Sequence, residues 1–206
     1  MRPHLHTRRW PASPINWKAH RVAKFIGEVE VSLGVAFATN DLRRICSAFD
    51  VAVVRCGISD VARDAELDRT TLYRAFRLKK GPGLDTMITV LRVLGFRLIV
   101  ETKDQSGFQS ANRSRHAPHP NARATARLLT VAFRTGDLDL VNEAFAKTLS
   151  LQENVSELAR KTVRSRGALY RAFAFRRTPR FSTVLSFLNA LELQFGVKQL
   201  RPKSPN

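Results

Sequence analysis

The sequence lacks several features that would assign it to a particular protein class. Its two cysteines, Cys46 and Cys56, do not make a disulfide framework, so a reducing cytosol fits best. No apolar run approaches the roughly 18 residues that a membrane span needs, and the first residues lack the apolar segment of a secretory signal. Their Arg-rich, acid-free composition leaves an organellar transit peptide open, but a basic flexible arm is the simpler interpretation.

Acidic residues are scarce: 17 Asp and Glu stand against 35 Lys and Arg, for a net charge of +18. Residues 1–27 carry six basic and no acidic groups, and residues 125–206 carry fourteen and six, whereas residues 28–101 are nearly balanced. Such an excess is typical of proteins that bind nucleic acids or other anionic surfaces, and it does not separate DNA from RNA.

The sequence also lacks the residue sets that catalysis requires. It contains no nucleophile–base set, no phosphate-binding glycine loop and no cluster of metal ligands. The five histidines lie in the N-terminal arm or the linker, without a cysteine or carboxylate at ligand spacing. We therefore expect a protein that is not an enzyme and that binds no cofactor and no metal.

The chain contains an internal repeat. Residues 58–100 and 155–197 align at a constant offset of 97, with 14 of 43 positions identical, and residues 35–49 match 131–145 at an offset of 96, with 8 of 15 identical. Two colinear blocks indicate a duplication. The predicted organisation is a basic arm, a first unit, a polar linker, a second unit and a tail, over residues 1–21, 22–101, 102–121, 122–198 and 199–206.

The periodicity of apolar residues predicts the same elements in each unit. In the first unit these are helices over 22–37 and 42–53, a short helix capped by Ser59, a helix from Arg69 to about Leu78 capped by Asp68, a helix over 84–94, and a strand over 96–101. The second unit repeats this order, with Ser156 and Ser165 at the two cap positions and a strand over 193–197. The predicted fold class is mainly α, with two tandem helix-turn-helix units that each end in one short strand.

The short helices and the strands predict how each unit folds and how the two units meet. Two short capped helices joined by a turn form a helix-turn-helix, and the small Ala62 and Ala159 let the second helix cross close to the first. The strands 96–100 and 193–197 would leave unpaired edges if alone, so we expect them to pair with each other. The result would be an intramolecular pseudo-dimer with an approximate twofold axis.

Both units carry the block LYRAF and a downstream proline, and the first unit ends in LGFRL. The stretches ISDVAR…LDRTTLYRAF…GPGLDTMITVLRVLGFRLIV and VSELAR…SRGALYRAF…TPRFSTVLSFLNALELQFGV resemble the addiction-module antidote proteins, which are antitoxins with a lambda-repressor-like (Xre-type) helix-turn-helix. The resemblance implies a bacterial, cytoplasmic, nucleoid-associated repressor of its own operon, with a small ribonuclease-type toxin as partner. The chain departs from the family in its tandem fusion, in Glu66 and Val163 where the turn usually has glycine, and in Glu192 where the first unit has Gly95.

The second helix of such a motif enters the major groove of DNA. Arginine pairs with guanine through two hydrogen bonds, and threonine reaches a base edge or a thymine methyl group. The first unit offers Arg69, Thr70, Thr71, Tyr73, Arg74 and Arg77; the second offers Lys161, Arg164, Arg166, Tyr170, Arg171, Arg176 and Arg177. Gly167 and Ala168 have no side-chain groups that can hydrogen-bond to a base. We therefore hypothesise that the first unit makes more base contacts and the second unit more phosphate contacts.

The predicted function is sequence-specific binding of double-stranded DNA, with no membrane partner. The alternative is a toxin-neutralising protein-interaction module with weak or non-specific nucleic-acid binding, which would use the basic arm with Trp10 and Trp17. A non-specific nucleoid or RNA binder would fit the charge, but it would leave the two reading helices unexplained.

Overall fold

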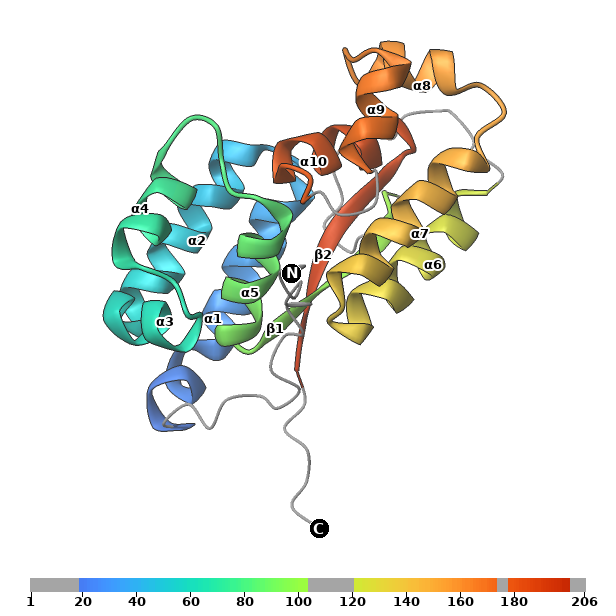
Figure 1. Ribbon diagram of the computed structural model, residues 1–206. Coiled ribbons are helices and arrows are strands. Elements are labelled where there is room, and N and C mark those ends of the chain that lie inside the picture. The colour runs from blue at the N-terminus through green and yellow to red at the C-terminus, as the bar shows by residue number, and fades with distance from the viewer. Residues whose placement is uncertain (1–18, 104–120, 174–177, 201–206) are drawn as a thin grey trace, which may run out of the picture.

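The computed structural model of this chain describes residues 19–103, 121–173 and 178–200. The first half consists of α1 (Ala19–Ala38), α2 (Leu42–Cys56), α3 (Ile58–Asp64), α4 (Arg69–Arg77), α5 (Leu84–Val93) and β1 (Phe96–Thr102). The second half consists of α6 (Ala122–Thr135), α7 (Leu138–Ser150), α8 (Val155–Lys161), α9 (Arg166–Ala172), α10 (Phe181–Ala190) and β2 (Leu193–Gln199). Over these residues, the predicted mainly helical fold with a strand at the end of each half is confirmed (Figure 1). Trp10, Trp17 and most of the linker lie outside the described residues.

Equivalent side chains begin the second helix of each half. Asp41 Oδ1 accepts hydrogen bonds from two N–H groups in the first turn of α2, and Asp137 caps α7 in the same way. The prediction that Ser59 caps α3 is wrong, because Gly57 at φ +90° ends α2 and already occupies the N-cap position of α3. Asp68 stands at the N-cap position of α4 as predicted, without a capping bond from its side chain.

The short helices of the second half are capped by one predicted and one unpredicted residue. Ser165 Oγ accepts a hydrogen bond from the N–H of Ala168 at 3.1 Å, which confirms Ser165 as the N-cap of α9. Ser156 is not the N-cap of α8. That position is held by Asn154, whose Oδ1 accepts from the N–H of Glu157 at 2.9 Å. Asparagine is as good an N-cap as serine, so the helix starts earlier than predicted and Ser156 falls inside it.

The two strands pair with each other in an antiparallel sheet, as predicted. The central pair of the register is Ile99 with Gly196, and these residues are counterparts at the repeat offset of 97. Phe96 pairs with Gln199 and Thr102 with Leu193, at equal distances from that centre. A register centred on a pair of counterparts places an approximate twofold axis of the two halves through this pair.

A second contact between counterparts lies on the same axis. Gly83 and Arg180 form an isolated antiparallel bridge. It is flanked by a hydrogen bond from Leu84 N–H to the Pro179 carbonyl at 2.9 Å and by its symmetric equivalent at 3.0 Å. These residues directly precede α5 and α10, whereas the strands directly follow those helices. The bridge and the strand pair therefore lie at opposite ends of α5 and α10.

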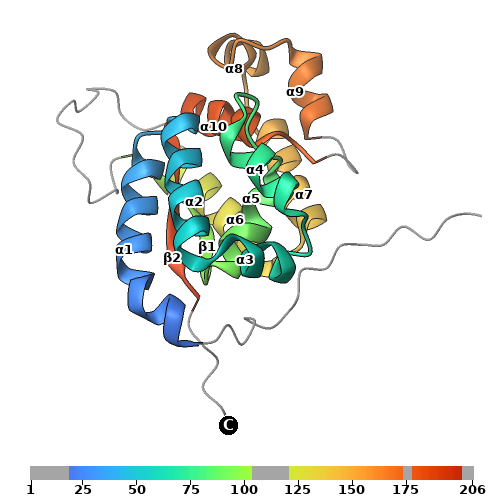
Figure 2. The same ribbon diagram turned by 90° about the vertical axis from the view of Figure 1, so that its left-hand side faces the viewer.

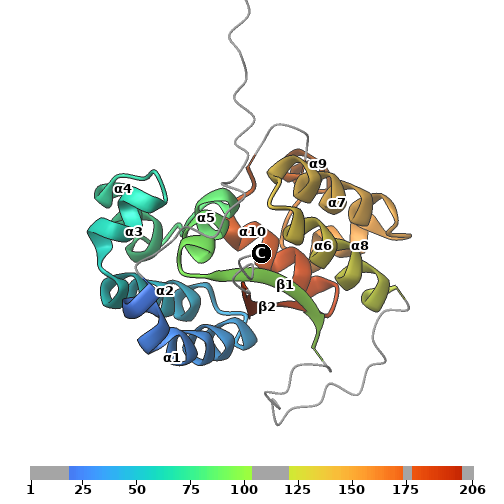
Figure 3. The ribbon, with the colours of Figure 1, turned by 90° about the horizontal axis from the view of Figure 1, so that it is seen from below.

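The first helix of each half packs on the strand of the other half: α1 contacts β2, and α6 contacts β1 (Figure 3). Thr130 on α6 covers the outer edge of β1, where its Oγ1 accepts from Val100 N–H at 2.8 Å and donates to the Val100 carbonyl at 3.1 Å. A covered edge cannot pair with another chain, so this hydroxyl limits the sheet to two strands on that side.

The halves share one hydrophobic core. The ring of Phe195 on β2 stacks on Phe181 with centroids 5.3 Å apart and meets Phe133 of α6 and Phe37 of α1 edge to face, at 5.5 and 6.2 Å. All four rings are buried, and Phe37 comes from the first half whereas the other three come from the second. Because aromatic side chains bury large apolar areas, this cluster fastens the two halves together.

Candidate nucleic-acid interface

Helices α3 and α4 in the first half, and α8 and α9 in the second, are joined by four-residue turns of the same geometry. In the first turn, Leu67 N–H donates to the Ala62 carbonyl at 2.9 Å, and in the second, Arg164 N–H donates to the Ala159 carbonyl at 2.9 Å. Shorter hydrogen bonds from Glu66 and Val163 close each turn from inside at 3.1 Å. This pair of bonds is the Schellman motif, which ends a helix and redirects the chain.

The Schellman motif requires a left-handed residue, and both turns have one. Glu66 and Val163 each have φ +53°. The second turn therefore has the geometry of the first, although a β-branched residue occupies it. Its side chain is 92% exposed, so no packing compensates for the strained backbone.

Each pair of short helices is held on the core by a small residue at the helix crossing, as predicted, and by a pair of stacked rings. Ala62 and Ala159 are buried at the helix crossings. Phe76 of α4 stacks on Phe49 with centroids 5.1 Å apart, and the equivalent rings, Phe173 and Phe145, stack at 5.0 Å. The buried side of α4 and α9 is thus fixed by matched aromatic pairs, and it leaves the opposite side to solvent.

That opposite side carries the predicted DNA-contacting residues. All those that the structure describes are exposed: Arg69, Thr70, Thr71, Tyr73, Arg74, Arg77, Lys161, Arg164, Arg166, Tyr170 and Arg171. Arg176 and Arg177 lie outside the described residues. Within the described ranges, the arginines at equivalent positions of the two helices, Arg69 with Arg166 and Arg74 with Arg171, form no ion pair.

Arg77 differs from these arginines because it is engaged inside its own half. Its Nε donates to the Asp50 carboxylate at 3.0 Å, and its guanidinium lies over the Tyr73 ring, 4.4 Å from the centroid. The hydrogen bond to Asp50 raises the pKa of the Arg77 guanidinium above its ordinary value. A phosphate or base would have to compete with Asp50 for this side chain.

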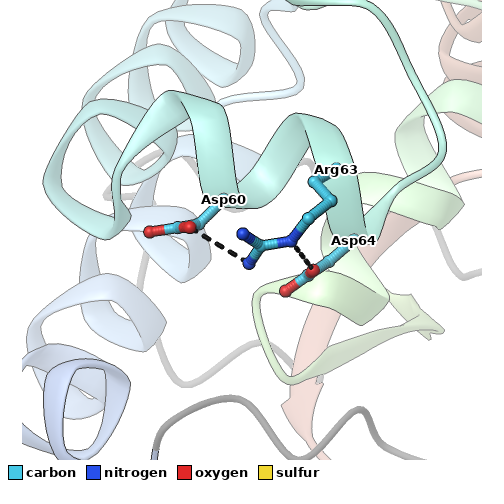
Figure 4. A network of polar contacts seen from close by, with 3 residues as sticks. All are labelled: Asp60, Arg63 and Asp64. Carbon is cyan, nitrogen blue, oxygen red and sulfur yellow. Dashed lines mark hydrogen bonds and ion pairs between the residues drawn. The ribbon is translucent and has the colours of Figure 1, made fainter.

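The first helices of the two motifs differ in charge. On α3, Arg63 Nη2 lies 3.0 Å from Asp60 Oδ1, and its Nε donates to Asp64 Oδ1 at 3.0 Å, so two carboxylates surround one cation (Figure 4). On α8 the corresponding charges are Glu157, Arg160 and Lys161, with Lys161 Nζ 3.2 Å from Glu157. Residues 58–77 carry four basic and four acidic groups, whereas residues 155–174 carry five and one. The surroundings of α9 are therefore the more attractive to a polyanion.

Helices α4 and α9 lie on the same side of the molecule. Figures 2 and 3 place α4 and α9 on one side of the two-stranded sheet, with α5 and α10 between the two motifs. The twofold axis defined by the strand register and by the Gly83–Arg180 bridge relates one motif to the other. A single straight ligand could therefore meet both helices at once.

The structure gives a position to Arg180, one of the basic residues around the second motif in the sequence. It is exposed and lies on the axis, directly opposite Gly83. Arg180 reaches the centre of the molecule only because the two halves pair with each other. The sequence alone shows little sign of this position. The repeat shows that a twofold axis must pass between two equivalent residues of the halves, but Gly83 and Arg180 are one of many such pairs.

Other chemistries find little support in the described parts of the chain. Cys46 and Cys56 are free and buried, and burial raises the pKa of both thiols, that of Cys46 to about 11. Residues 19–103, 121–173 and 178–200 hold no group of three His, Cys, Asp or Glu side chains suited to a metal ion. Among the helices of these residues, none is both long and apolar enough to cross a membrane.

Comparison with known proteins gives one result. A family model described as a probable addiction module antidote protein matches the chain twice, over residues 24–102 and 120–199. No curated protein and no solved structure matches. The two matched segments contain all ten helices and both strands of the described residues except the first part of α1, and they correspond to the two halves of the fold.

Proposed function

Because the chain belongs to the family of probable addiction module antidote proteins, we propose that it is a sequence-specific DNA-binding regulator that represses its own operon. In this proposal α4 and α9 are reading helices that enter the major groove of one duplex. The protein acts by occupying DNA and not by catalysis. Its place is the bacterial cytoplasm, in association with the nucleoid.

The observation that carries this proposal is the matched placement of arginines that form no ion pair with any residue the structure describes. Arg69 and Arg74 on α4 have equivalents in Arg166 and Arg171 on α9, and all four are exposed. Figure 3 places the two helices on one side of the two-stranded sheet. Helix-turn-helix dimers bind two half-sites about one helical turn, roughly 10 base pairs, apart. The internal twofold axis supports the same mode of binding by one chain, and the short connection between the halves raises the effective concentration of the second contact.

The two reading helices are not equal. Beside its arginines, α4 exposes Thr70 and Thr71, whereas α9 has Gly167 and Ala168 at these positions. The α8–α9 motif has the larger excess of positive charge. We infer that the first half supplies more of the base contacts and the second half more of the phosphate contacts, so the target is an imperfect palindrome.

Binding-site selection from a random duplex library, repeated at two salt concentrations, tests this function. We expect one motif with a well-defined half and a degenerate half, about one turn apart, at both concentrations. Loss of all binding at modest salt, with no motif recovered, would indicate non-specific electrostatic attraction and would contradict the proposal.

Membership of the antidote family supports a second function, neutralisation of a small ribonuclease-type toxin. The test is co-expression with the product of the neighbouring gene in its own genome. Growth arrest by that gene alone, relieved by this chain, is the expected result. Arrest that persists at equal expression of both proteins would exclude this function for that gene product.

A further inference from the structure

A pocket of about 240 Å³ lies between α9 and the segment that leads into α10. It is lined by Ala168, Arg171 and Ala172 of α9 and by Thr178, Pro179 and Arg180. Two small alanines of α9 form its helical wall, and two long cationic side chains, Arg171 and Arg180, also line it.

The charge of this pocket selects for an anion. Among the described residues that line it, Arg171 and Arg180 are the ionisable ones, and none of these described residues is a carboxylate. Both side chains are exposed, and within the described residues neither forms an ion pair. Two guanidinium groups and the hydroxyl of Thr178, which also lines the pocket, offer the positive charge and the hydrogen-bond donors that a phosphate group requires.

The first half does not repeat the described lining residues of this pocket. At the repeat offset of 97, Arg171 corresponds to Arg74, but Arg180 corresponds to Gly83 and Thr178 to Gly81. One cation and the hydroxyl are therefore missing from the first half. The two halves therefore differ here in the side chains of the segments that lead into α5 and α10. Their backbones are equivalent, because both take part in the bridge between Gly83 and Arg180.

The position of the pocket identifies which phosphate it would meet. Arg180 lies on the twofold axis, at the end of α5 and α10 away from the strands, and Arg171 lies on the second reading helix. A duplex that contacts both reading helices crosses this axis midway between its half-sites. The pocket then faces the sugar–phosphate backbone near the centre of the site, on the side of the second half.

We propose that the Arg171–Arg180 pocket binds one backbone phosphate at the centre of the DNA site, on one strand only. This proposal rests on the proposed function, namely that the chain binds duplex DNA through α4 and α9. The pocket would fix the orientation of the chain on the duplex, because the second half holds a central phosphate and the first half has no matching contact.

The test compares Arg180→Ala with Arg127→Ala, which removes the same charge from an exposed position on α6. Arg180 belongs to neither reading helix, so base recognition should be preserved. On the selected duplex, or on a mixed-sequence duplex of about 30 base pairs if no motif is recovered, R180A should weaken binding about tenfold, as expected for one charge-assisted hydrogen bond. It should also reduce the salt slope by about 0.9, whereas R127A should change neither value appreciably.

Single methylphosphonate substitutions along both strands locate the contact. With the native chain, neutralising one central phosphate of one strand should weaken binding about tenfold, and this effect should vanish with R180A. Equal behaviour of R180A and R127A, or an effect that is the same on both strands and persists in R180A, would overturn the pocket proposal while leaving DNA binding intact. Failure of the native chain to bind any duplex would instead overturn the proposed function on which the pocket depends.

Discussion

Within the described residues, the chain has left-handed backbone at four residues other than glycine: Asn40, Glu66, Val163 and Glu192. Each has a counterpart in the other half that is also left-handed, so the conformation belongs to the fold and not to the residue. Val163 is the only β-branched member of this set, and left-handed backbone costs an L-residue about 1–2 kcal/mol. The fold tolerates this cost because the Schellman bonds of the turn fix the backbone.

The residue scale therefore yields a stabilising substitution. Val163→Gly should raise the free energy of unfolding by about 1 kcal/mol, because glycine adopts positive φ without steric cost. The side chain is almost fully exposed, so little packing is lost. Chemical denaturation followed by circular dichroism measures the change.

An exposed valine in a right-handed helix provides the control. Val131 on α6 is 58% exposed, and Val131→Gly should lower the free energy of unfolding by up to about 1 kcal/mol through loss of helix propensity. Destabilisation by both glycine substitutions would show that Val163 is not strained.

Single residues also mark where sequence reasoning reached its limit. The exposed arginines and the cap at Ser165 depend on neighbours within one helix or turn, so local patterns predicted them. The Asp50–Arg77 pair joins residues 27 positions apart on two helices, and nothing in the local pattern signals it. Arg77 was consequently grouped with the free reading residues.

At the scale of elements, the two motifs share a backbone and differ in chemistry. Helices α4 and α9 both pack through a stacked pair of rings, but α3 neutralises its arginine with two aspartates, whereas α8 keeps an excess of positive charge. Periodicity and turn residues predicted these helices well because both signals are local. Their roles depend on the charges that the folded helices bring together.

This difference predicts opposite phenotypes for two arginine substitutions. Arg69→Ala on α4 should relax sequence preference in one half-site, with about 1–3 kcal/mol lost on the preferred base and little lost on random DNA. Arg164→Ala in the α8–α9 turn should weaken binding to all duplexes alike and reduce the salt slope by about 0.9. Titration of selected and random duplexes over a salt series measures both effects.

One result would contradict the inferred difference between base contacts in the first half and phosphate contacts in the second. If both variants lose the same affinity on selected and random duplexes, the halves do not differ in function. The charges by which α3 and α8 differ would then be solvent-exposed groups that do not affect DNA binding.

At the scale of the molecule, the twofold axis could be predicted only in part. The duplication and the unpaired strands predicted that the strands would meet, and they do. The exchange of α1 onto β2 and of α6 onto β1, and the bridge at Gly83 and Arg180, arise from tertiary packing that no periodicity encodes. These contacts turn two repeated units into one core.

A shared core predicts one cooperative unfolding transition. Phe195→Ala removes the ring that touches aromatic side chains of both halves, and it should lower the free energy of unfolding by about 3–5 kcal/mol. Phe76→Ala, which lies in the first half alone, should shift the same single transition. Calorimetry that resolves two transitions, with F76A moving only one of them, would show that the halves unfold separately.

The central claim is that one chain presents two unequal reading helices to one duplex. Hydroxyl-radical footprinting on the selected duplex, with the number of chains per duplex counted by native mass spectrometry, tests it most directly. The account predicts one chain per duplex and two protected patches on one face of the DNA, about 10 base pairs apart, with the stronger base contacts under α4. Two chains on each duplex, or a single protected patch under one chain, would contradict it.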